Sequence, residues 1–245
     1  MTADDTPRGS SGVAGGARPT PDIVAIDGPA GSGKSSVARA AAVRLGYQFL
    51  DTGAYYRAVA WHGLETAAAM EDPDAVVRLV EETPVEGALD PAERWVRVGA
   101  RDVTEAIREP RVSAATTFVA RNQTARDRLN ADFREIIAAA EPGVVVEGRD
   151  ITTVVVPDAR VRLLLTADMA VRAQRRAKEL IDAGNAVDTE SVLAAIEERD
   201  AKDSAMVEFL TAAPGVEVID STLLSFDETV DAVVALVRGT DGGTA

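Results

Sequence analysis

The chain has no cysteine and only one histidine, His62, among its 245 residues. Without cysteine it cannot form disulfides, bind metals through thiolates or use a thiol nucleophile. A single histidine cannot build a histidine metal cluster. His62 lies near the end of an expected helix, so we interpret it as an ordinary helical residue, although a role as a lone base stays open.

Lysine is also scarce, because only Lys34, Lys178 and Lys202 accompany 23 arginines. The 26 basic residues face 40 acidic ones, which gives a net charge of −14. Such a chain lacks the surplus cations that non-specific nucleic-acid binding or a polybasic membrane anchor requires. Genome base composition can account for the many arginines, but arginine also suits bidentate recognition of phosphates.

No segment approaches the roughly 18 consecutive apolar residues of a membrane span. Residues 1–21 are rich in Gly, Ser, Thr and Pro and lack the apolar run of a signal peptide, so we expect a disordered tail there and a frayed end at 239–245. With 46% apolar and 27% charged residues, we expect one domain over 22–238 and a cytoplasmic location.

Strands and helices are expected to alternate along most of the chain, which is typical of an α/β protein with a parallel sheet covered on both faces. The expected strands are 23–26, 47–50, 144–146, 160–165 and 216–219, with two or three short antiparallel strands within 84–104. The expected helices are 34–45, 54–70, 73–82, 110–121, 124–140, 168–182, 189–203 and 226–238.

The first strand is followed by a match to the phosphate-binding loop G-x-x-x-x-G-K-[ST], the P-loop, at residues 28–35. Its glycines let successive backbone N–H groups surround a phosphate at a helix N-terminus. Lys34 is expected to bridge the β- and γ-phosphates, and the Ser35 hydroxyl is expected to ligate Mg²⁺. The predicted nucleotide-binding residues are Gly28, Pro29, Ala30, Gly31, Ser32, Gly33, Lys34, Ser35 and Ser36. The chain lacks the Asn-Lys-x-Asp motif that reads guanine, which argues against a GTPase.

Two further polar segments directly follow expected strands, at the sheet edge where ligands bind in open α/β folds. The segment 50–57 contains Arg57, which could face a bound phosphate or could be a surface arginine. The segment 144–150 places Glu147 after an apolar strand, where it could hold Mg²⁺ directly or through water. Arg149 and Asp150 could bind substrate or could form a pair that fixes the loop.

Two later helices carry Arg172, Arg175 and Arg176, and then Arg199 and Asp203. A charged helix face is usually solvated. Phosphoryl transfer, however, requires cations over the transferring group, and such arginines can supply roughly 10³–10⁵ in rate.

Together these segments resemble the bacterial cytidylate kinases, which are P-loop nucleoside-monophosphate kinases. The resemblance covers nearly all of 23–237 and is carried by IDGPAGSGKSS (26–36), LDTGAYYRAVA (50–60), VVEGRDITTVVVPDA (145–159), LTADMAVRAQRR (165–176) and EERDAKDS (197–204). It implies a P-loop NTPase fold with a parallel sheet, an inserted monophosphate-binding part at 84–111 and a helical lid at 172–185. It also implies ATP with Mg²⁺ on the P-loop and CMP or dCMP opposite it.

The resemblance implies roles for particular side chains. The substrate-binding residues would be Asp51, Thr52, Arg57, Thr117, Arg126, Arg149, Asp150, Arg199 and Asp203. The catalytic residues would be Lys34, Arg57, Arg149, Arg176 and Arg199, with Ser35 and Glu147 at the metal.

Within these roles, Arg57 and Arg149 would hold the acceptor phosphate. Cytosine would be read by Thr117, Arg126 and Asp150, and Asp203 would contact the ribose.

Five positions depart from the usual family pattern. Thr52 and Thr117 stand where serine is common, and either hydroxyl can form the hydrogen bond. Met206 replaces an arginine, Phe133 a glutamine and Thr152 a glycine. Because Met206 cannot replace a cation, it puts one acceptor contact in doubt.

The predicted reaction is the transfer of a phosphoryl group from ATP to CMP or dCMP by a monomer. Its partners would be nucleotides, with no nucleic acid and no membrane. The alternatives are a kinase for UMP, AMP or a small molecule such as shikimate, and a non-catalytic nucleotide-binding regulator.

Overall fold

The computed structural model describes residues 21–182, 184, 187–204 and 210–240. The strands are β1 (Asp22–Asp27), β2 (Gln48–Asp51), β3 (Val85–Gly87), β4 (Val96–Val98), β5 (Arg101–Asp102), β6 (Gly143–Gly148), β7 (Val161–Thr166) and β8 (Glu217–Asp220). The helices are α1 (Lys34–Leu45), α2 (Thr52–Glu65), α3 (Pro73–Glu82), α4 (Pro110–Ala120), α5 (Gln123–Ala138), α6 (Met169–Asp182), α7 (Thr189–Ser204) and α8 (Phe226–Gly239). Short helical turns cover Ala106–Arg108 and Ile151–Val155.

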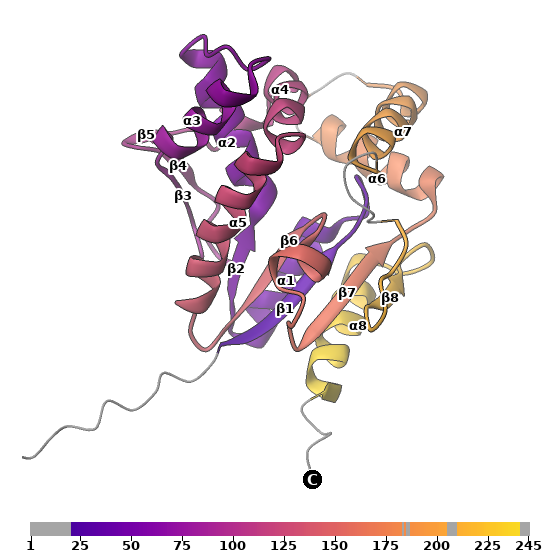
Figure 1. Cartoon of the computed structure of the whole chain (residues 1–245). Helices are drawn as coiled ribbons and strands as arrows, with labels where there is room; N and C mark the ends of the chain where they lie inside the picture. The colour runs from indigo at the N-terminus through magenta and orange to yellow at the C-terminus, as the bar shows by residue number, and fades with distance from the viewer. Residues whose placement is uncertain (1–20, 183, 185–186, 205–209, 241–245) are drawn as a thin grey trace, which may run out of the picture.

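Five strands form a parallel sheet in the order β2-β6-β1-β7-β8 (Figure 1). In the register of this sheet Asp27 pairs with Gly148 and Asp51 with Glu147. The carboxyl ends of β1, β2 and β6 therefore bring the P-loop and both predicted polar segments to one edge, as expected for a ligand site in this fold class. The predicted α/β class with a parallel sheet is confirmed.

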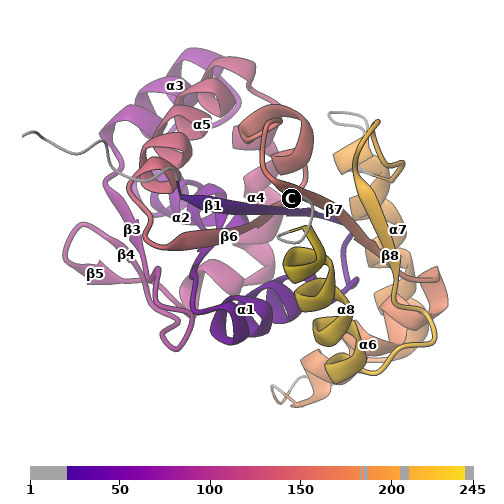
Figure 2. The same ribbon diagram turned by 90° about the horizontal axis from the view of Figure 1, so that it is seen from below.

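Both faces of the sheet are buried, because side chains alternate between two hydrophobic clusters. Val24, Ile26 and Val145 pack with α1 and α8, whereas Ala25 and Val146 belong to the cluster that contains α2, α4 and α5. Seen from below, α1 and α8 cover one face, and α5 lies on the other (Figure 2). This explains why the central strands have no polar face.

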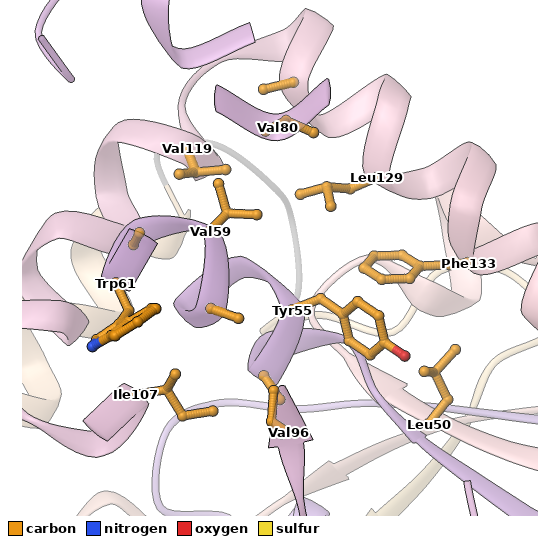
Figure 3. Packing of buried hydrophobic residues seen from close by; sticks show 14 of the residues in the cluster. Leu50, Tyr55, Val59, Trp61, Val80, Val96, Ile107, Val119, Leu129 and Phe133 are labelled. Atoms are coloured by element: carbon orange, nitrogen blue, oxygen red, sulfur yellow. The ribbon is translucent and has the colours of Figure 1, made fainter. Parts of the chain in front are cut away.

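A second, three-stranded antiparallel sheet, β3-β4-β5, lies within the segment predicted to contain short antiparallel strands. Its inward side chains join the α2 and α5 cluster, where the Tyr55 and Phe133 rings meet edge to face with centroids 5.4 Å apart. Figure 3 shows the two rings together between Leu50 and Leu129. The small sheet thus shares the core of the main domain.

The predicted extent of one helix was wrong. The helix expected at 54–70 ends at Glu65, because the chain turns at Ala67 with a positive φ of 52°. A turn of Ile151–Val155 within the loop after β6 was not predicted. Nearly all of the expected tails, 1–20 and 241–245, lie outside the described residues. No helix in the described part of the chain is long and apolar enough to span a membrane.

Candidate active site

The P-loop has the backbone that its glycines permit. Gly31 and Gly33 have positive φ angles of 73° and 83°, and Gly33 precedes the first turn of α1. A Cβ atom on Gly28 would lie 2.3 Å from the Leu165 carbonyl oxygen. Larger residues would therefore strain or displace the loop at these three positions.

Side chains around the loop are arranged for an anion. The Ser32 hydroxyl is buried and has no hydrogen-bond partner among the residues that the structure describes. The Lys34 side chain is 13% exposed, with Nζ 3.9 Å from Glu147 Oε2. Pro29 is buried and Ser36 is exposed at the start of α1. A buried hydroxyl that still lacks a partner and a mostly buried ammonium group at a helix N-terminus can both donate hydrogen bonds to a phosphate group.

Glu147 and Asp51 lie opposite each other on β6 and β2. Burial and the neighbouring Asp51 raise the pKa of Glu147, in opposition to Lys34 and Ser35. Burial also acts to raise the pKa of Asp51, but Arg57, the Ala54 N–H and Lys34 outweigh it and lower that pKa. Glu147 is therefore the easier of the two carboxyl groups to protonate.

The residues predicted to hold Mg²⁺ fit that ion. Ser35 Oγ donates to Glu147 Oε1 at 2.6 Å, so a hydroxyl and a carboxylate are adjacent beneath the P-loop. Mg²⁺ typically uses one or two such oxygen ligands together with substrate phosphates and water. No group of three acidic or imidazole side chains in the described part could hold a metal by itself.

Three of the residues predicted to bind the acceptor make contacts close to Glu147 or to the P-loop. Thr52 Oγ1 donates to the Glu147 carbonyl at 2.8 Å, and Arg57 Nη2 lies 3.2 Å from Asp51 Oδ2. Arg149 Nη1 donates to the Gly28 carbonyl oxygen at 2.6 Å. The structure therefore places Arg149 next to the P-loop and Arg57 next to the end of β2, the strand beside β6.

Two predicted base-reading residues form a buried pair. Arg126 Nη2 lies 2.6 Å from Asp150 Oδ2, and both residues are about nine-tenths buried. Burial, and to a lesser extent Asp150, raise the pKa of the adjacent Tyr56 hydroxyl. A guanidinium and a carboxylate held together in this way offer both donors and an acceptor to one planar base.

Asp27, at the end of β1, fixes the loop that carries Arg149 and Asp150, and the sequence analysis missed it. Its carboxylate accepts hydrogen bonds from Ile151 N at 2.9 Å, Thr152 N at 2.9 Å and Thr152 Oγ1 at 2.6 Å. Burial raises the pKa of Asp27, partly offset by these donors. The sequence did contain a signal for this role, because an aspartate is the last residue of an apolar strand and directly precedes Gly28 of the P-loop.

Other predicted residues are not brought into this network. Thr117 lies on α4, and its side chain forms no hydrogen bond in the described structure. Arg176 is exposed and pairs with Glu179 on its own helix, Nη1 to Oε2 at 3.0 Å. Arg199 and Asp203 lie on α7, for which only the backbone is described at these positions. Met206 lies outside the described residues.

A parallel sheet with a P-loop between β1 and α1 and an acid at the end of a neighbouring strand defines a P-loop NTPase fold. The model of the family described as cytidylate kinase matches residues 24–239. The chain is 44% identical to the cytidylate kinase of Cutibacterium acnes over 222 residues, which cover 89% of this chain and 96% of the relative. It is 40% identical to that of Nocardia farcinica, with 89% and 94% covered. The chain belongs to the cytidylate kinase family.

The predicted kinase class is thereby confirmed. As a member of this kinase family, the chain uses ATP as phosphate donor and binds nucleotide substrates.

Proposed function

We propose that this enzyme transfers the γ-phosphoryl group of ATP to CMP or dCMP and gives ADP and CDP or dCDP. The observation that carries the proposal is the position of Glu147 between the two sites. Glu147 accepts a hydrogen bond from Ser35 of the P-loop, and it lies opposite Asp51 of the segment 50–57, which we assign to the acceptor. A donor site and an acceptor site that share one strand end can hold two phosphate-bearing substrates for direct transfer.

On the donor side, the P-loop amides and the N-terminus of α1 bind the ATP phosphates, and Lys34 neutralises charge on the transferring group. Ser35 and Glu147 would hold Mg²⁺, which when bound neutralises negative charge on the phosphate oxygens. Arg176 and Arg199, carried by the proposed lid at 172–185 and by the next helix, would add cations when these helices approach the nucleotide.

On the acceptor side, Arg57 and Arg149 bind the monophosphate. Arg126, Asp150 and Thr117 read cytosine. Asp51 and Thr52 also bind the acceptor, Asp203 contacts the ribose, and the insert at 84–111 covers the nucleotide.

The acceptor needs no general base, because a phosphate monoester has its second pKa near 6 and is already ionised at neutral pH. Catalysis then rests on positioning and charge stabilisation.

The test is an acceptor panel of CMP, dCMP, UMP, AMP and shikimate, each with ATP and Mg²⁺, with ADP formation as the readout. We expect the highest kcat/KM with CMP or dCMP. A preference for AMP, UMP or shikimate would assign the alternative kinase. ATP binding without acceptor-stimulated ADP formation would assign a non-catalytic regulator.

Lys34→Ala should lower kcat by about 10²–10³-fold or more, because it removes a preformed charge from the transition state. Its circular dichroism spectrum and urea midpoint should stay close to those of the wild type. Lys178→Ala is the matched control, because the Lys178 side chain is 75% exposed and, in the described part of the chain, its ion pair is with Asp182 on the same helix. Equal activity of the Lys34 variant and the control would contradict the assigned role.

We also propose that the enzyme acts as a cytoplasmic monomer with nucleotides as its partners and no nucleic-acid or membrane ligand. Light scattering coupled to gel filtration tests the first point, and a dimer mass across the concentration range of the assay would refute it.

A further inference from the structure

Ala30 of the P-loop is held by two helices that are distant in the sequence. Ala30 N donates to Asp200 Oδ1 of α7 at 3.1 Å, and the Ala30 carbonyl oxygen accepts from Arg172 Nη1 of α6 at 2.8 Å. Both backbone polar groups of this one residue are thus bound by side chains. We call Ala30, Arg172 and Asp200 the Ala30 clamp.

The clamp is closed by a buried ion pair. Arg172 Nη1 lies 2.5 Å from Asp200 Oδ2, and the two side chains are only 5% and 6% exposed. Arg172 Nε also donates to the Ala167 carbonyl oxygen at 3.1 Å, just after β7. Each charge is therefore compensated inside the protein, and removal of one would leave the other buried without a partner.

Packing supports the same contact. The Ala30 side chain is buried in a small cluster with Ala173, Ala177, Val192 and Ile196 of α6 and α7. A Cβ on Gly31 would lie 2.8 Å from the Arg172 carbonyl oxygen, so the backbone of α6 approaches the loop directly. Figure 1 shows α6 and α7 side by side, on the opposite flank of the molecule from α2 to α5.

The motif G-x-x-x-x-G-K-[ST] leaves the residue at position 30 unspecified, so the loop glycines alone do not fix this peptide. The clamp supplies that restraint from outside the loop. A P-loop binds phosphate through the directions of its N–H groups. The orientation of the Ala30 peptide therefore affects the nucleotide, although Arg172 and Asp200 are engaged by the protein itself.

We propose that Arg172 and Asp200 are positioning residues for the ATP phosphates, and that they couple the shape of the P-loop to the placement of α6 and α7. This inference rests on the proposed function for its kinetic readouts. Loss of the clamp leaves the P-loop free to adopt shapes that bind phosphate poorly, and the affinity for ATP and ADP falls. Most of the proposed acceptor residues lie on α2, α4, α5 and at the ends of β2 and β6, away from the clamp, and are affected much less, whereas Arg199 and Asp203 share α7 with Asp200.

The main test is the double variant Arg172→Met/Asp200→Leu, because a buried ion pair can often be replaced by apolar residues without loss of stability. We expect a urea midpoint near that of the wild type, a KM for ATP and a Kd for ADP raised about tenfold, and a KM for CMP within twofold. A folded double variant with wild-type Kd for ADP would overturn the proposal, because the clamp would then be merely structural.

Two further variants complete the test, one as a control and one as a second change in the clamp. Arg128→Met/Asp132→Leu removes an exposed ion pair of α5, Nη2 to Oδ1 at 3.4 Å, and should leave the constants for ATP and ADP unchanged. If the double clamp variant fails to fold, Arg172→Lys keeps the charge, but its ammonium is one bond closer to the backbone than Nη1 and cannot also replace the Nε donor to Ala167. A raised Kd for ADP in that variant supports the proposal, and an unchanged Kd refutes it.

The ADP titration by calorimetry needs no acceptor. If the wild type failed to phosphorylate CMP, the proposed function would fall while the clamp would still be tested.

Discussion

Thr152 stands where the family usually has glycine, and the structure gives this residue a role. Its hydroxyl donates to Asp27, beside the two backbone donors that the same carboxylate accepts. The extra hydrogen bond helps to hold a buried charge and thereby the loop of Arg149 and Asp150. The change from glycine to Thr152 therefore adds a hydrogen bond to Asp27 and removes none.

Thr152→Val should destabilise the protein by about 1.5–3 kcal/mol at neutral pH, because it removes a hydrogen bond to a charged acceptor. Burial raises the folded-state pKa of Asp27, so the native state binds this proton more readily than the unfolded chain does. The free energy of unfolding therefore falls as pH rises from the ordinary pKa of an aspartate to the raised pKa of Asp27 in the folded protein. The Thr152 hydroxyl stabilises the ionised carboxylate and opposes that loss. The difference in free energy of unfolding between wild type and variant should therefore widen as pH rises through this range.

Urea denaturation at several pH values measures this gap. Thr153→Val is the control, because Thr153 is exposed in the same turn and its side chain has no hydrogen bond in the described structure. A pH-independent gap would show that the hydroxyl acts only through packing.

At the scale of elements, α2 packs against the small antiparallel sheet, and α5 packs against α2 through aromatic side chains. Phe133 is fully buried on α5, packed edge to face on Tyr55 and tilted against Tyr56, with centroids 5.4 and 6.2 Å away. Phe133 replaces the glutamine that is usual in the family, and an apolar aromatic cluster occupies this position.

Phe133→Gln should destabilise the protein by about 3–5 kcal/mol, since it removes an aromatic ring from a packed site and buries an amide there. Phe133→Leu, a milder change in volume, should cost less than about 1.5 kcal/mol. Urea midpoints measure both. If the two variants were equally stable, the site would have to contain a partner for the amide.

Much of this arrangement could be predicted from the sequence, because some elements are specified locally. The P-loop needs glycines with positive φ at Gly31 and Gly33, and the central strands need continuous apolar residues. The end of α2 could not be predicted, because Ala67 adopts a positive φ that alanine does not specify. The bonds of Asp27, Arg172 and Asp200 could not be predicted either, since a charged residue in a sequence does not name its partner.

At the scale of the whole molecule, the net charge of −14 opposes the approach of a dianionic substrate. Four arginines nevertheless line one hollow beside Asp51: Arg39, Arg57, Arg94 and Arg108. In the described structure Arg94 and Arg108 form no ion pair. Burial lowers the pKa of Arg39, and the positive charges of Arg94 and Arg108 lower it further. The acidic surface thus contains a local concentration of positive charge beside the segment 50–57, in which Arg57 is paired with Asp51.

Arg94→Glu/Arg108→Glu should lower kcat/KM for CMP by about tenfold at low ionic strength, with kcat nearly unchanged, because the approach of the anion is no longer favoured. Salt should diminish the difference, since the Debye length falls to about 3 Å at 1 M. Arg78→Glu/Arg128→Glu changes the net charge equally at exposed sites on α3 and α5 and serves as control. The same loss in both proteins would attribute the effect to net charge alone.

The Ala30 clamp also has a consequence for the order in which the protein matures during synthesis. Ala30 and Asp200 are separated by 170 positions, and Arg172 by 142. A nascent chain that has emerged only as far as β6 contains the complete P-loop motif but none of the side chains that hold the Ala30 peptide. Because domains generally fold as units, we expect the chain to acquire tight nucleotide binding only after α7 has left the ribosome.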